Sequence, residues 1–188
     1  MDLAAYEQIR QRFMARIIED KRDRRVIAGD EVSLVFENHD TVLFQIQEML
    51  RTERITKEAA VLHELETYND LVPAANELSA TMFVEIADPV VRDRRLFELA
   101  GLEDRIALEV LGVTVRARNQ TRGVLPDRTT AVHYVKFLLG AELAQSFVAR
   151  ASAGAAALAT FILDHPKLSL RKGLPPATLK ALRDDLAV

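Results

Sequence analysis

The chain has 188 residues, of which 49% are hydrophobic and 28% charged, with a formal net charge of −3 and no cysteine. This composition is typical of a globular chain with a core and differs from the core-poor balance of disordered chains. The lack of cysteine excludes disulfides, thiolate metal sites and a cysteine nucleophile. The small negative charge removes the usual electrostatic reason for binding nucleic acid, so we expect none.

The N-terminus is charged throughout and lacks the apolar stretch of a signal peptide. The longest apolar-rich run, residues 153–163, is shorter than the roughly 20 residues that a membrane-spanning helix needs. We therefore expect a cytoplasmic protein that makes no membrane contact. The sequence leaves the oligomeric state open, a homodimer included.

Apolar side chains recur at steps of three and four residues near the N-terminus, at Leu3, Tyr6, Ile9, Phe13 and Ile17. This spacing predicts an amphipathic helix over residues 3–24. We expect one α+β domain over residues 1–188, in which the N-terminal helix of residues 1–25 is either part of the body or an appendage.

Alternating apolar residues predict the first two strands, over residues 32–36 and 80–86. Between them we expect a helix capped by Asn38 or Asp40, and a second helix over residues 56–72 that Pro73 ends.

The second half of the chain begins with a helix that Asp88 caps and that ends near Gly101. We then expect a hairpin over residues 106–117, a polar loop over 119–129, strands over 131–138 and 158–163, and helices over 142–150 and 174–185. Strands and helices do not alternate regularly. This order favours an α+β fold with an antiparallel or mixed β-sheet and helices packed on it.

One segment, residues 36–51, resembles an uncharacterised bacterial family, domain-of-unknown-function family 3501. Further matching segments extend the resemblance over nearly the whole chain, at residues 68–69, 77–81, 134–137 and 164–166. The family has no established activity and no agreed catalytic motif, so no residue inherits a role. The resemblance implies a redox or peroxide-stress setting, with an iron–sulfur oxidoreductase or a rubrerythrin-like protein as partner.

No phosphate loop, dinucleotide fingerprint or nucleophile elbow occurs in the chain, and we expect no cofactor. His63 and Glu66 lie one helical turn apart, but a metal site usually needs more ligands than two, so they are weak candidates for a metal site. His133 lies on the apolar face of the predicted strand over residues 131–138. A buried histidine needs a polar partner, and we expect Glu37 or Glu85 to be that partner.

The polar groups of residues 37–51 stand out because the surrounding sequence is strongly apolar. Glu37, Asp40 and His133 are our candidates for acid–base chemistry or metal binding. The candidate binding residues are Asn38, Gln45, Gln47, Glu48, Arg51 and Tyr134. Glu48 and Arg51 are spaced to pair with each other on one helix.

Three functions follow from these patterns. The first is a non-enzymatic accessory or interaction protein. The second is an enzyme or metal-binding protein of an unrecognised type that uses Glu37, Asp40 and His133. The third is a small-molecule sensor with a pocket between the helix of residues 40–53 and the sheet. No sequence motif decides among the three.

Overall fold

The structure is a computed structural model that describes residues 3–119, 125, 127–155 and 157–187. Its first half contains α1 (Leu3–Arg24), β1 (Arg25–Ala28), β2 (Val32–Glu37), α2 (His39–Thr52), α3 (Glu58–Asn69) and β3 (Glu77–Val84). The middle contains α4 (Pro89–Glu98), the short 3-10 helix η1 (Leu102–Arg105), β4 (Ile106–Val110), β5 (Val113–Arg116) and β6 (Arg118–Asn119). The last part contains β7 (Val132–Leu138), α5 (Ala141–Ser152), β8 (Ala159–His165), β9 (Leu168–Gly173) and α6 (Pro176–Leu186).

The strands form two sheets. One has the order β1-β2-β3-β7-β6 and the other the order β5-β4-β8-β9. Within the described residues every strand pairing is antiparallel. The α+β prediction is therefore confirmed, and of the two sheet types it allowed, the antiparallel one is present.

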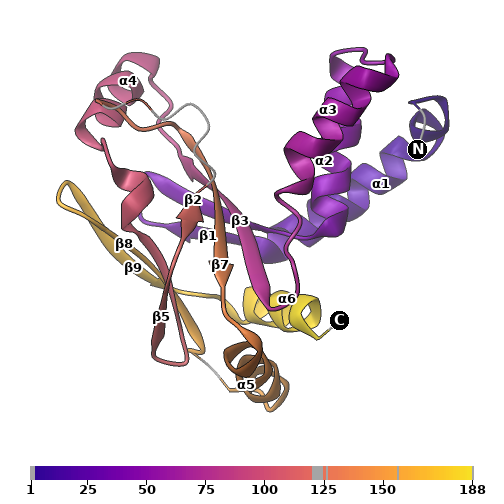
Figure 1. The fold of residues 1–188 in the computed structure, drawn as a ribbon. Coiled ribbons are helices and arrows are strands. Elements are labelled where there is room, and N and C mark those ends of the chain that lie inside the picture. The colour runs from indigo at the N-terminus through magenta and orange to yellow at the C-terminus, as the bar shows by residue number, and fades with distance from the viewer. Residues whose placement is uncertain (1–2, 120–124, 126, 156, 188) are drawn as a thin grey trace.

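A single large hydrophobic cluster joins the two sheets. Alternate residues of β2 and β3, such as Phe36 and Met82, lie in it beside Leu108 of β4 and Phe161 of β8. Side chains of α4, α5 and α6 belong to the same cluster, and Figure 1 shows these helices at the ends of the strands. We call the two sheets with α4, α5 and α6 the body.

The other face of the five-stranded sheet carries α1, α2 and α3, which extend away from the body in Figure 1. A second, smaller hydrophobic cluster holds them together, built on Val42, Ile46 and Leu50 of α2 and on Leu71. We call these three helices the helical projection. All six residues of β2 are buried, because this strand has the body on one face and the projection on the other.

Two helices, α2 and α4, begin at capping residues that the sequence indicates. The Asn38 side chain accepts a hydrogen bond from the Thr41 backbone N–H and so starts α2. Asp88 caps α4 in the same way, ahead of Pro89 at the first helical position. Gly101 adopts the left-handed conformation with φ of 81°, which ends this region as predicted.

The expected end of the second helix was wrong. Helix α3 ends at Asn69, before Pro73. Strands β1 and β9 were not predicted, because β1 has only four residues and β9 is rich in exposed polar side chains. Much of the loop expected over residues 119–129 lies outside the described residues.

Candidate functional site

Glu37 lies at the junction between the body and the helical projection. Its carboxylate accepts a hydrogen bond of 2.5 Å from the Thr41 hydroxyl of α2 and one of 2.7 Å from the Thr81 hydroxyl of β3. The residue is only 3% exposed. A buried carboxylate with two hydroxyl donors is well placed to hold β2, α2 and β3 together.

His133 lies on the opposite face of the same sheet. It is 4% exposed, and its Nε2 is 3.3 Å from the Thr129 hydroxyl, which in turn donates to the Glu103 carboxylate at 2.9 Å. Burial lowers the pKa of His133, and the nearby charge of Glu103 acts in the opposite direction. The expected partners, Glu37 and Glu85, were wrong, since the ring contacts Thr129 and the nearby carboxylate is that of Glu103. Strand alternation explains this result, because Glu37 points to the helical projection and His133 points into the body.

Asp40 has a third environment. Its carboxylate accepts a 2.6 Å hydrogen bond from the Arg16 guanidinium of α1 and lies 3.2 Å from the His39 ring, in a half-exposed position. Glu37, Asp40 and His133 therefore do not meet in one pocket. The structure brings none of the three within hydrogen-bonding contact of another.

The remaining polar residues of the 37–51 segment join the helices to one another. Asn38 caps α2, and Gln45 lies near the Tyr68 side chain of α3, where it opposes the rise in the pKa of Tyr68 that burial causes. Arg51 pairs with Glu7 of α1 at 2.5 Å. The expected local pair between Glu48 and Arg51 is therefore wrong, because both residues bind α1 instead.

Glu48 of α2 accepts three hydrogen bonds from side chains of α1. Its carboxylate accepts two hydrogen bonds from Arg10, of 2.8 and 2.7 Å, and one of 2.6 Å from the Tyr6 hydroxyl. The Arg10 hydrogen bonds hold the pKa of Glu48 below its usual value, and the Tyr6 hydroxyl acts in the same direction. Burial and this carboxylate together raise the pKa of Tyr6.

The other candidates are divided among α2, β7 and α3. Gln47 is buried on α2, and Tyr134 packs against the hydrophobic cluster of the helical projection. His63 and Glu66 are exposed on α3. In the described part of the chain, no three His, Cys, Asp or Glu side chains are grouped closely enough to hold a metal ion.

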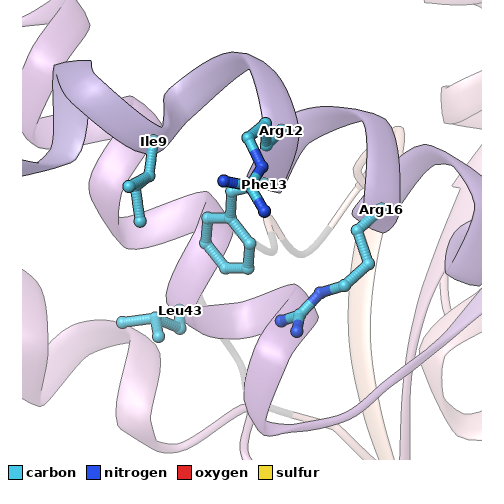
Figure 2. A pocket seen from close by; sticks show the side chains of 5 residues that line it. All are labelled: Ile9, Arg12, Phe13, Arg16 and Leu43. Atoms are coloured by element: carbon cyan, nitrogen blue, oxygen red, sulfur yellow. The ribbon is translucent and has the colours of Figure 1, made fainter.

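An open groove lies between α1 and α2. Its lining residues are Ile9, Arg12, Phe13, Arg16 and Leu43, and its volume is about 460 Å³. Figure 2 shows Ile9 and Phe13 pointing from α1 toward Leu43, with the two arginines beside them. The Phe13 ring packs edge-on against the ring of Phe44 on α2, and the two ring centres are 5.7 Å apart. We call this feature the α1–α2 groove.

The chain matches the model of a protein family over residues 1–186, and that family is described as Protein of unknown function (DUF3501). The chain belongs to this family. A solved structure from Burkholderia pseudomallei K96243, described as a novel protein of unknown function, is similar with 33% sequence identity and a TM-score of 0.87. That match covers 99% of this chain and 95% of the other. No protein with curated annotation matched the chain.

Membership in the family confirms the resemblance found in the sequence and adds no assigned residue. Among the residues that the structure describes, no helix is both long and apolar enough to cross a membrane.

Sequence reasoning did not find the α1–α2 groove. It assigned Ile9 and Phe13 to the buried face of the N-terminal helix, but Ile9 is 39% exposed. The available signal was the pair of arginines beside them, at positions 12 and 16. A strictly amphipathic helix would not place arginine next to apolar residues on its packing side.

Proposed function

We propose that this chain is an accessory protein that binds a protein partner through the α1–α2 groove. The observation that supports this proposal is the groove itself, in which the exposed Ile9 and the partly buried Phe13 and Leu43 lie beside two arginines. Apolar and aromatic side chains together with arginine are enriched at protein interfaces. An aromatic anchor held by a second ring is also preorganised for contact.

The geometry of the acid–base candidates favours binding over chemistry. Glu37 is engaged by two hydroxyl groups, Asp40 by Arg16, and His133 lies inside the body beside Thr129 and Glu103. A reaction that used all three would need them around one substrate. Their separation therefore leaves the groove as the better-supported site.

We further propose a redox or peroxide-handling system as the setting of this binding. This part rests on the family resemblance, which implies an iron–sulfur oxidoreductase or a rubrerythrin-like protein as partner. Because the chain has no cysteine, any thiol or thiolate-bound cluster chemistry belongs to the partner.

Retention of a partner by the tagged full-length protein tests the proposal. We expect a partner to copurify with the wild type and to be lost with Ile9→Glu, since this change places a charge in the groove. Ile18→Glu is the matched control, because Ile18 is on the same helix, is 61% exposed and does not line the groove. The proposal is wrong if no partner is retained under mild conditions, or if both variants retain it equally.

A further inference from the structure

We infer that the segment that docks in the α1–α2 groove is an acidic amphipathic helix. Its apolar stripe lies on Ile9, Phe13 and Leu43, and its carboxylates meet Arg12 and Arg16. This inference rests on the proposed function and specifies the chemistry of the partner.

The shape of the groove fits a helix. It is formed by two helices that pack side by side, with Tyr6 and Arg10 of α1 both bound to Glu48 of α2. Amphipathic helices recognise such grooves through apolar residues at steps of three and four. Ile9 and Phe13 are four residues apart, so their side chains follow each other along one face of α1.

The positive charge beside the groove favours a partner with acidic side chains. Arg12 has no hydrogen bond or ion pair among the described residues. Along its own helix, the positions one turn away from Arg12 carry no acidic side chain, being Gln8, Ile9, Ala15 and Arg16. The whole chain carries a net charge of −3, so this positive edge is a local exception. An acidic partner is attracted here and weakly repelled elsewhere.

Asp40 already binds Arg16 and therefore competes with an acidic partner for this arginine. The Arg16 guanidinium lies 5.1 Å from the centre of the Phe13 ring and donates a hydrogen bond to Asp40. A carboxylate from the partner has to share or replace Asp40 at this arginine. Removing the Asp40 charge is therefore expected to strengthen acid binding, which is an effect that a purely apolar interface would not show.

Synthetic peptides of about 15 residues test the inference, a length at which an amphipathic helix becomes marginally stable alone. The first peptide has leucine at steps of three and four and glutamate on the other face. The second replaces every glutamate by lysine, and the third scrambles the order of the first. We expect the full-length protein to bind the first peptide at low salt, the scrambled one at least about fivefold more weakly, and the lysine peptide not at all.

Variants of the protein test whether the peptide binds in the α1–α2 groove. Arg12→Gln is expected to weaken binding of the acidic peptide about threefold to fivefold, in line with an exposed ion pair. Ile9→Glu is expected to weaken it more than about tenfold. Asp40→Asn is expected to tighten it, and Ile18→Glu is expected to leave it within about twofold. Circular dichroism of each variant verifies that the fold is retained.

Several results would overturn the inference. These are equal binding of the acidic and lysine peptides, no binding of either, or binding that Arg12→Gln and Asp40→Asn leave unchanged.

Vesicles of an anionic phospholipid are a second probe. Binding of vesicles without binding of the acidic peptide would indicate a membrane surface instead. Loss of the peptide effects while a partner still copurifies would reject only the acidic helix. Absence of any copurifying partner would reject the proposed function.

Discussion

The body and the helical projection are stabilised in different ways. In the body, alternate strand residues from two sheets meet in one large hydrophobic cluster. In the projection, the hydrophobic cluster is small, α3 has no fully buried residue, and charged pairs such as Arg10–Glu48 and Arg51–Glu7 join the helices. Because the body buries more apolar surface, we expect it to be the more stable region and the helical projection to open at a lower free energy.

The largest effect should follow from opening the core of the body. Phe161→Ala removes a ring with no exposed surface, and we expect the free energy of unfolding to fall by about 3–5 kcal/mol. Leu65→Ala, in the smaller cluster of the projection, should cost about 1 kcal/mol because this side chain is only partly buried. Urea denaturation measures both, and equal losses would contradict the comparison.

The next effect should come from the residue that joins the two regions. Glu37→Ala leaves the Thr41 and Thr81 hydroxyls without their buried acceptor, and we expect a loss of about 2–3 kcal/mol. Glu37→Gln keeps an oxygen acceptor and should cost about 1 kcal/mol. If hydrogen exchange of α2 is the same in Glu37→Ala and the wild type, Glu37 does not couple the projection to the body.

A smaller effect should appear in the pH dependence of the body. Burial lowers the pKa of His133, so below about pH 6.5 the unfolded chain takes up a proton that the folded chain does not. The free energy of unfolding should therefore fall as the pH drops below this value, by at most about 1.4 kcal/mol per pH unit. His133→Gln removes this contribution, and denaturation at several pH values compares the two slopes. Identical slopes would contradict the prediction.

The smallest effect should come from the contact between α1 and α2. Glu48→Gln weakens the hydrogen bonds to Arg10 and Tyr6 at a partly exposed position, and we expect a loss of about 0.5–1 kcal/mol at pH 7. Because the pKa of Glu48 is lowered in the fold, the wild-type advantage should be complete above about pH 4.5 and disappear as the pH falls through the lowered value. An advantage that does not change with pH would contradict this explanation.

The sequence predicted most of the elements, because local signals define them. The Asn38 cap, the Asp88-Pro89 start and the alternation in β2 each act within a few residues. It did not predict which side chains meet. Glu103 and His133, which Thr129 connects, are separated in the sequence by strands β4, β5 and β6, and Glu48 binds Arg10 on a different helix. Exposure also depends on packing, so the apolar spacing that includes both Ile9 and Ile17 did not distinguish the exposed Ile9 from the buried Ile17.

The tyrosines give the molecule an internal optical probe. The chain has three tyrosines and no tryptophan. Tyr6 lies on α1 and Tyr68 on α3, and Tyr134 packs from the sheet against the same small cluster. Intrinsic fluorescence therefore senses the helical projection and its contact with the sheet, whereas far-ultraviolet circular dichroism senses the whole fold. A projection that loosens before the body melts would separate these two signals without any added label.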